Sequence, residues 1–386
     1  MAKRTPRTLR WRIALVGILL VTPACLNMSA SGGGGALASN LGGSLSGEPV
    51  HLTIGYQPYY TQAWSGVAMR GKEFWKKYLP AGSTVNFQVG LQGAVIVSQL
   101  VAGKQQIGYM GDMPSLVSTS KRPTRDLRIV ATLGIAQDQC NILLARNDAP
   151  DFASPKQAVQ WMNGKTVATP QGSCTDRFTR SIFQKYGVKP SAYLNQSIEV
   201  ISSNFQNRRI DGATVWEPVA ARLVDQHIAK RVASGSNFNE DDAGFLVMAK
   251  DLMDKRPDVV EAYLKAELEA QEWVANPANA LELAQMAVDQ TQGYTLKDMW
   301  DAMFGVWAGG HANDLSNRMP FVVNRQAQDL IDHSWAFLYK AKVIPQPEPL
   351  AGIVQDTIAQ NVLAKSGAKL PIEVRTLPAS EFKAKG

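Results

Sequence analysis

Short apolar runs alternate along the chain with longer segments whose apolar residues recur every three or four positions, beginning at Val50. The short runs predict strands at 51–54, 85–89, 107–110 and 128–133. The segments between them predict helices, over 64–78, from 93 onward and after 114. Strands that alternate with helical stretches of about 10–15 residues are typical of parallel β-α-β units.

The same alternation starts again after residue 140 and indicates a second α/β block. Strands are predicted at 141–145, 166–168, 197–202, 212–215 and 229–233, and helices at 173–186, near 204–209 and from 216 onward. Phe178 and Ile182 share one face of the first of these helices, and Gly187 is a typical helix stop. The run at 244–249 predicts a strand that returns to the first block, and beyond Pro257 the pattern is mostly helical. This order favours two α/β lobes, with the second inserted into the first.

The first 24 residues have the pattern of an export signal: five positive charges, no negative one, and an apolar run at 13–21 that is too short to span a bilayer. Cleavage after Ala24 would leave Cys25 first, in a pattern similar to the bacterial lipoprotein box, where the cysteine is acylated. Ordinary cleavage further on, for example after Ala38, is the alternative. Residues 25–49 are rich in Ser and Gly, which predicts a flexible linker. We therefore expect the protein in the periplasm or at the extracytoplasmic membrane surface.

The charge balance and the missing motifs exclude several classes of function. The 386 residues carry 40 Lys and Arg against 33 Asp and Glu, a formal charge of +7, but without the first 24 residues the balance is 35 against 33. A surface that binds phosphate backbones needs a larger excess, so we expect no nucleic-acid partner. Zinc-protease, Cys-x-x-Cys and nucleophile-elbow motifs are absent, and the four His lie away from the predicted strand ends. We expect no catalysis, no cofactor and no bound metal.

Several segments together carry a resemblance to a known family. They are Gly55-Tyr56-Gln57-Pro58, residues 103–114, residues 164–173 and residues 211–218. In this order and behind an export signal, they resemble the periplasmic solute-binding proteins of the nitrate, sulfonate and taurine class, which serve ABC importers.

The resemblance covers about residues 50–300 and implies a type II periplasmic-binding-protein fold. Such a fold has two lobes, each a mostly parallel sheet flanked by helices, that close on a small ligand in the cleft between them. On this basis residues 50–136 and 239–386 are expected in lobe I and residues 137–238 in lobe II. A monomer is expected, with an ABC permease and its ATPase as partners.

Ligands of open parallel sheets lie beyond the carboxyl ends of the strands, where loops lead into helices. Residues 137–140 are expected at the crossing between the lobes. Taken with the resemblance, the corners and this crossing give the candidate ligand-binding residues: Gln57, Tyr59, Tyr60, Trp64, Gln92, Gly93, Asp112, Met113, Gln137, Asp138, Cys140, Ser173, Cys174, Thr175, Arg177, Trp216 and Glu217. Ser173 and Thr175 are expected to hold an anionic group at the start of a helix, and Arg177 to add a charge. Helix capping or core packing is the alternative role for each side chain.

Cys140 and Cys174 depart from what the resemblance leads us to expect, since small polar residues are usual at both positions. In an oxidising compartment the two cysteines predict a disulfide, with free thiols lining the pocket as the alternative. Two cysteines with no neighbouring histidine make poor zinc spacing.

We therefore expect the binding component of an ABC importer for a small organic anion, with a sulfonate such as taurine or an alkanesulfonate as the first choice. Nitrate, bicarbonate and aromatic carboxylates are alternatives within the same class. A ligand-sensing lipoprotein without a transport role is an alternative outside it. A related eukaryotic branch includes a thiamine-pyrimidine synthase, but its active-site histidines and cysteine-rich motif are not visible in this sequence.

Overall fold

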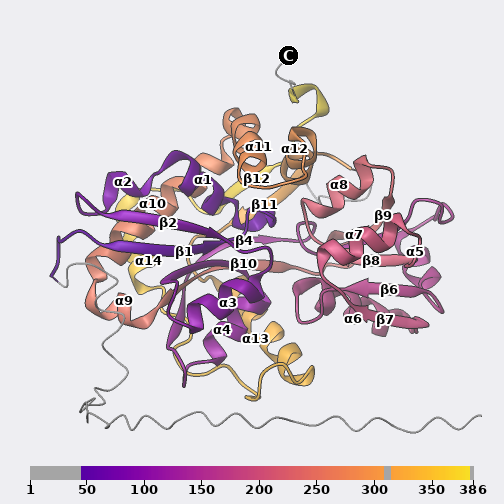
Figure 1. The fold of residues 1–386 in the computed structure, drawn as a ribbon, viewed down its shortest axis with the longest axis horizontal. Helices are drawn as coiled ribbons and strands as arrows, with labels where there is room; N and C mark the ends of the chain where they lie inside the picture. The colour runs from indigo at the N-terminus through magenta and orange to yellow at the C-terminus, as the bar shows by residue number, and fades with distance from the viewer. Residues whose placement is uncertain (1–44, 308–313, 383–386) are drawn as a thin grey trace, which may run out of the picture. The chain divides into compact units, whose positions relative to one another are not determined.

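The computed structural model describes residues 45–307 and 314–382. The predicted export signal, Cys25 and most of the predicted linker lie outside the described residues. Two β-sheets organise the described chain (Figure 1). We call the part built on the seven-stranded sheet lobe I and the part built on the five-stranded sheet lobe II.

The sheet of lobe I mixes parallel and antiparallel strands in the order β12-β11-β4-β10-β3-β1-β2. Strands β1, β2 and β3 are parallel, whereas β10 is antiparallel to both β3 and β4. The strands are β1 (His51–Tyr56), β2 (Thr84–Val89), β3 (Ile107–Gly111), β4 (Leu127–Ala136), β10 (Asp242–Ala249), β11 (Leu315–Met319) and β12 (Ile372–Arg375). The two C-terminal strands thus complete the sheet of lobe I.

The sheet of lobe II has the order β7-β6-β8-β5-β9, with β6 parallel to β7 and β8 and with β5 antiparallel to β8 and β9. Its strands are β5 (Ile142–Arg146), β6 (Thr166–Thr169), β7 (Ala192–Asn195), β8 (Gly212–Val215) and β9 (Ala229–Ser234). All five come from one uninterrupted stretch of chain. Lobe II is joined to lobe I by the segment between β4 and β5 and by the segment between β9 and β10.

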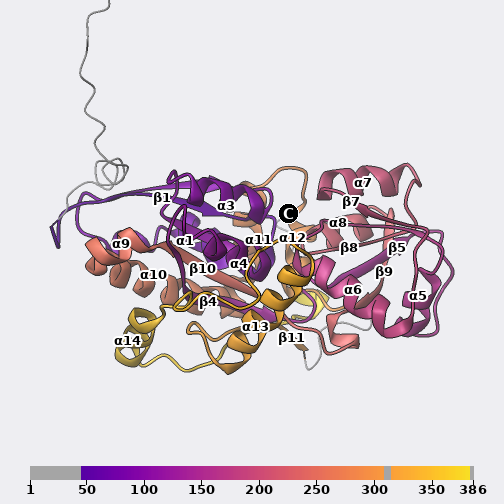
Figure 2. The ribbon, with the colours of Figure 1, turned by 90° about the horizontal axis from the view of Figure 1, so that it is seen from below.

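Helices flank both sheets. Those of lobe II are α5 (Pro155–Trp161), α6 (Cys174–Tyr186), α7 (Ile198–Gln206) and α8 (Val219–Asp225). The others are α1 (Trp64–Lys72), α2 (Trp75–Tyr78), α3 (Gly93–Val101), α4 (Asp112–Ser120), α9 (Lys250–Lys255), α10 (Pro257–Ala275), α11 (Ala280–Asp289), α12 (Leu296–Phe304), α13 (Arg325–Lys340) and α14 (Thr357–Ser366). Figure 2 shows α13 beside α4. None of the described helices is long and apolar enough to cross a membrane.

Two predicted elements differ from the structure. The helix predicted over 64–78 is broken between α1 and α2, because Glu73 adopts a left-handed conformation with φ of 53°. The strand predicted at 197–202 is wrong, since α7 begins there. Ser197 caps that helix by accepting a hydrogen bond from the Val200 amide.

A polar cluster inside lobe I makes stability depend on pH. Glu267 of α10 is fully buried, accepts hydrogen bonds from Tyr109 Oη at 2.7 Å and Gln271 Nε2 at 3.0 Å, and burial raises its pKa to about 7. A carboxyl with a raised folded pKa binds more protons when folded than when unfolded. Its contribution is therefore complete below the unfolded pKa of about 4.5 and is lost as pH rises through about 7.

We expect the free energy of unfolding to fall by up to about 3 kcal/mol between pH 4.5 and pH 8 on account of Glu267. Denaturant unfolding across that range should show the fall in the native protein and a flatter profile in Glu267→Gln. Glu269→Gln, two residues along α10 and close to Lys77 on the surface, is the matched control. A profile that Glu267→Gln leaves as steep as in the native protein would contradict the assignment.

Candidate functional site

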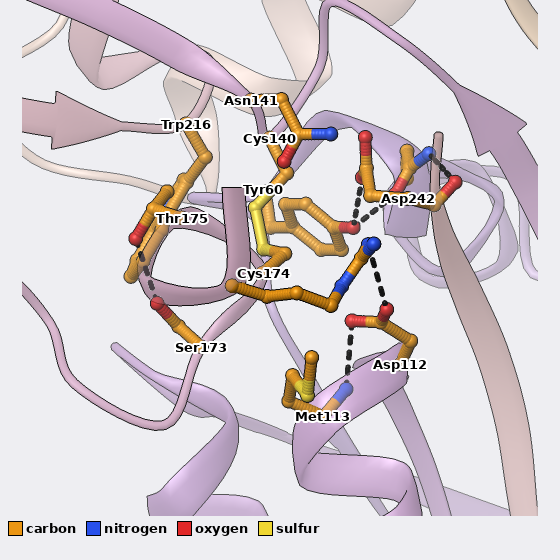
Figure 3. The surroundings of a disulfide bond; sticks show 12 residues. Tyr60, Asp112, Met113, Cys140, Asn141, Ser173, Cys174, Thr175, Trp216 and Asp242 are labelled. Atoms are coloured by element: carbon orange, nitrogen blue, oxygen red, sulfur yellow. Dashed lines mark hydrogen bonds and ion pairs between the residues drawn. A yellow bond between two sulfur atoms is a disulfide. The ribbon is translucent and has the colours of Figure 1, made fainter. Parts of the chain in front are cut away.

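A disulfide lies where the two lobes meet. It joins Cys140, which precedes β5, to Cys174, the first residue of α6, with their Cα atoms 6.2 Å apart. In Figure 3 the Tyr60 ring lies beside the disulfide, and the Tyr60 hydroxyl points toward Asp242. The bond ties the start of α6 to the segment through which the chain enters lobe II.

An ion pair next to the disulfide joins the two lobes. Arg177 of α6 and Asp112 of α4 are both buried, and Arg177 Nη2 lies 3.4 Å from Asp112 Oδ2. The same guanidinium donates to the Asp241 carbonyl at 2.6 Å. Asp112 also accepts hydrogen bonds from the Met113 amide at 2.7 Å and from Ser334 Oγ at 2.9 Å. The predicted ligand residues Asp112 and Arg177 thus bind each other, and Met113 lies in the core of lobe I.

A second buried carboxyl completes this cluster. Asp242 begins β10 and is fully buried, and burial, followed by the charge of Asp112, holds its pKa well above the usual range. Tyr60 Oη donates to Asp242 Oδ2 at 3.2 Å, whereas Oδ1 has no hydrogen-bond partner among the described residues. Burial first, and then the neighbouring Asp112 carboxylate, therefore hold Asp242 toward its neutral form against the opposing effect of Arg177.

The hydroxyl groups at the start of α6 form hydrogen bonds within the turn itself. Ser173 Oγ donates to the Pro170 carbonyl at 2.5 Å and lies 2.7 Å from Thr175 Oγ1. The Gly172 amide donates to Asp176 Oδ2 at 3.0 Å, so a carboxylate of the chain itself lies at this helix start. Ser173 and Thr175 remain the predicted anion-binding pair, but an entering anion would have to compete with these partners.

The corner after β1 is mostly buried. Trp64 belongs to the core, and its Nε1 donates to the Pro58 carbonyl at 2.9 Å. Gln57 is buried, and no protein group among the described residues binds its Oε1. Gln92 precedes α3 in extended conformation, and Gly93 begins that helix. A Cβ at Gly93 would lie 2.4 Å from Pro114 Cγ, so the close approach of α3 and α4 requires glycine.

Gln137 and Asp138 lie at the crossing between the lobes, directly after β4 ends at Ala136. Gln137 Nε2 donates to Asn239 Oδ1 at 3.2 Å, and Asp138 Oδ1 accepts from the Ser236 amide at 3.2 Å. Both therefore connect the two segments that join the lobes. They also line a polar cavity of about 410 Å³ that Arg318 borders.

The corner after β8 connects to the corner after β1. Trp216 Nε1 donates to the Tyr59 carbonyl at 3.0 Å, which places the two predicted aromatic residues next to each other across the lobes. Glu217 is turned away from them: it forms a buried ion pair with Arg231, its Oε2 accepts from the Ala221 amide at 2.9 Å, and burial raises its pKa.

Tyr59 and Trp216 line a cavity of about 200 Å³ between the lobes. Its other lining residues were not identified from the sequence; they are Leu91, Ile198, Glu199, Val219, Arg222, Gln292 and Tyr294. A larger cavity of about 660 Å³ between α6 and α13 includes Arg177 among its lining residues. The smaller cavity brings together residues from the corners after β1, β2 and β8.

The walls of the smaller cavity are held in place by local contacts. The Arg222 guanidinium carbon lies 4.3 Å from the centroid of the Tyr294 ring, and Arg222 Nη2 donates to Ser202 Oγ at 3.3 Å. The Tyr59 and Tyr294 ring centroids are 5.8 Å apart, and the Gln292 amide donates to Tyr59 Oη at 3.1 Å. Burial raises the pKa of Tyr294. The cavity thus combines aromatic walls with a positioned cation.

The arrangement of two α/β lobes around a cleft defines a class: the type II periplasmic-binding-protein fold. A nitrate-binding protein of Synechocystis PCC 6803 shares it, with a TM-score of 0.67 and 17% identity over 87% of this chain and 92% of that chain. A desulfurization enzyme also shares it, with a TM-score of 0.60 and 15% identity over 82% of this chain and 99% of that chain. The type II fold expected from the sequence is confirmed. The expectation of mostly parallel sheets is wrong: both sheets are mixed, because β10 in lobe I and β5 in lobe II run antiparallel to both of their neighbours.

Comparison with known sequences identifies the family to which the chain belongs. The NMT1-like family profile matches residues 46–288. The taurine-binding periplasmic protein of Escherichia coli K12 is 27% identical over 252 residues, which cover 62% of this chain and 74% of that protein. The chain belongs to the NMT1-like family. It is a solute-binding protein of the sulfonate, taurine and nitrate class, the substrate-binding component of an ABC importer.

Proposed function

We propose that the protein captures a small organic anion, with a sulfonate as the preferred class, in the cavity between Tyr59 and Trp216. The observation that carries the proposal is the position of Arg222. Arg222 borders this cavity, and its guanidinium carbon lies 4.3 Å from the centroid of the Tyr294 ring, which positions a planar cation suited to binding an oxyanion.

The size and lining of the cavity support a small ligand with an apolar part. Drug-sized ligands occupy roughly 300–1,000 Å³, and this cavity has about 200 Å³. Leu91, Ile198 and Val219 are apolar lining residues that an alkyl chain can contact, whereas nitrate and bicarbonate have no group for them. The similarity to a taurine-binding protein points to the same class. Nitrate, bicarbonate, aromatic carboxylates and a sensing role without transport remain the competing functions.

A binding screen on the full chain, unfolded and refolded to remove bound ligand, tests the proposal. At a hundredfold excess over Kd, a sulfonate should stabilise the fold by about 2.7 kcal/mol. The panel holds taurine, alkanesulfonates, nitrate, bicarbonate and aromatic carboxylates. Stabilisation by another class without any by sulfonates would overturn the ligand assignment.

Substitutions at the two candidate positions then show where the anionic group of the ligand binds. Arg222→Gln should weaken sulfonate binding by about 2–3 kcal/mol, the value of a hydrogen bond to a charged group. Arg209→Gln, an exposed arginine that does not line the cavity, should leave affinity unchanged. If instead Ser173→Ala with Thr175→Ala weakens binding and Arg222→Gln does not, the anion lies at the start of α6.

A further inference from the structure

The disulfide has a carboxyl group from the other lobe as an immediate neighbour. The sulfur atoms of Cys140 and Cys174 and a carboxylate oxygen of Asp242 all lie within 4.8 Å of one another, and all three residues are buried. Cys140 lies at the entry to lobe II and Cys174 starts α6 of that lobe, whereas Asp242 begins β10 of lobe I. Three side chains of types that bind metal ions thus converge where the lobes meet.

Two buried oxygen atoms beside the disulfide have no hydrogen-bond partner among the described residues. Asp242 Oδ2 accepts from Tyr60 Oη at 3.2 Å, but Asp242 Oδ1 accepts from no group. Asn141 Nδ2 donates to the Glu240 carbonyl at 3.0 Å, but Asn141 Oδ1 has no donor. Figure 3 shows both side chains close to the disulfide. Buried oxygens are normally satisfied, and a bound cation or an ordered water satisfies those that the protein leaves open.

The donor atoms match the preference of zinc. Zn²⁺ binds cysteine thiolates and carboxylate oxygens with tetrahedral geometry, and a site with three protein ligands keeps a water in the fourth position. The two cysteines alone make poor zinc spacing, but the fold adds Asp242 from a strand far along the chain. Asn141 Oδ1 can accept a hydrogen bond from the zinc-bound water, a kind of outer contact that metal sites commonly have.

We propose that the reduced chain binds one Zn²⁺ through Cys140 Sγ, Cys174 Sγ and Asp242 Oδ1, in place of the disulfide. A phosphine and water supply two electrons and two protons, so the S–S bond breaks to give two thiols and the phosphine becomes its oxide. Zn²⁺ then replaces the protons of the two thiols and of the Asp242 carboxyl, which pass to solvent. The proposal does not rest on the proposed function, because none of these three residues lines the cavity between Tyr59 and Trp216.

The two forms connect different parts of the molecule. The disulfide joins the entry to lobe II with α6 of the same lobe, so it leaves lobe I outside the bond. Zinc bound to Asp242 as well would join lobe II to β10 of lobe I. The oxidation state of the cysteines and the supply of zinc would therefore decide whether the lobes are tied together at this point.

The metal content after refolding tests the proposal. The untagged full chain is unfolded and reduced with a phosphine, refolded under phosphine with zinc sulfate, and freed of loose metal by gel filtration. It should retain one zinc ion per chain, whereas the chain refolded in air should retain none. Cobalt in place of zinc should give the intense absorption of tetrahedral, thiolate-bound Co²⁺, which reports the sulfur ligands directly.

Variants identify the ligands. Cys140→Ser with Cys174→Ser should lose the zinc. Asp242→Asn should weaken zinc binding about tenfold or more, measured by competition with a chromogenic chelator, because the loss of an outer contact alone commonly costs about 10- to 100-fold. Asp241→Asn is the matched control and should keep the native affinity, since the Asp241 carboxylate is bound by Gln326 Nε2 at 3.0 Å.

The possible results bear on separate parts of the proposal. If the reduced native chain retains no zinc, if the double serine variant retains it, or if Cys25→Ser loses it, the site is overturned. If zinc requires Cys140 and Cys174 but Asp242→Asn binds it with native affinity, the contribution of lobe I is overturned. Circular dichroism shows whether each variant is folded. Should Asp242→Asn fail to fold, the cobalt spectra of the native chain and the double serine variant still decide whether the two cysteines hold the metal.

Discussion

Replacing Arg177 by leucine should lower the free energy of unfolding by about 3–5 kcal/mol, the usual cost of removing one partner of a buried ion pair. Arg177 is 2% exposed and Asp112 is 0% exposed, so the Asp112 carboxylate would remain in the interior without its guanidinium. The Asp241 carbonyl would lose a donor at 2.6 Å as well. Urea unfolding at pH 7 measures the change.

Arg325→Leu is the matched control for this prediction. Arg325 also pairs with an aspartate on its own helix, but both side chains of the Arg325–Asp329 pair are exposed, by 89% and 59%, so its removal should cost about 1 kcal/mol or less. Arg177→Leu combined with Asp112→Asn should recover part of the lost stability, because no unpaired charge then remains at Asp112. Equal effects of Arg177→Leu and Arg325→Leu would show that the ion pair between the lobes does not stabilise the fold.

Loss of the disulfide should cost about 4 kcal/mol. A bond that closes a loop of 34 residues limits the freedom of the unfolded chain, and the chain-entropy estimate for that length gives this value. Unfolding of the native protein should therefore shift to lower denaturant when a phosphine reductant is present, because the unfolded chain is then reduced. Refolding in air should restore the original stability.

The double variant Cys140→Ser with Cys174→Ser serves as the control, since the reductant should leave its stability unchanged. It should unfold at the same denaturant concentration as the reduced native protein, apart from the small cost of burying two hydroxyl groups. A native protein whose unfolding does not respond to the reductant would contradict a stabilising bond.

Most strands and helices could be predicted from the sequence, because the spacing of apolar residues shows which side chains are buried. That spacing differs between a strand and a helix. The segment at 197–202 shows the limit of that approach. Ile198, Glu199 and Val200 alternate like a strand, yet Ser197 caps a helix whose buried residues Ile198, Ile201 and Phe205 recur every three or four positions. The strand in this part of the chain is β7, which ends at Asn195, two residues before the capping residue Ser197.

The candidate site was predicted only in part. Tyr59 and Trp216 lie at strand ends, which the sequence marks, and the structure brings them together. Arg222 lies inside α8, and Tyr294 comes from a segment about seventy residues further on, so only the tertiary structure shows that they meet. Asp112 and Arg177 were identified as polar residues at corners. Their mutual pairing could not be anticipated, because it depends on how closely the two lobes approach.

Lobe II is formed by one continuous stretch of chain, and this affects the order in which the two lobes fold. All five strands of its sheet are complete once Ser234 has been synthesised, whereas the sheet of lobe I needs β12, which ends at Arg375. Contacts between residues close in sequence form at a smaller entropic cost than contacts between distant ones. Lobe II is therefore expected to fold first as the chain emerges, and the two halves of lobe I to come together around it last. Slow steps in refolding should accordingly report on β10, β11 and β12 rather than on the disulfide-linked lobe.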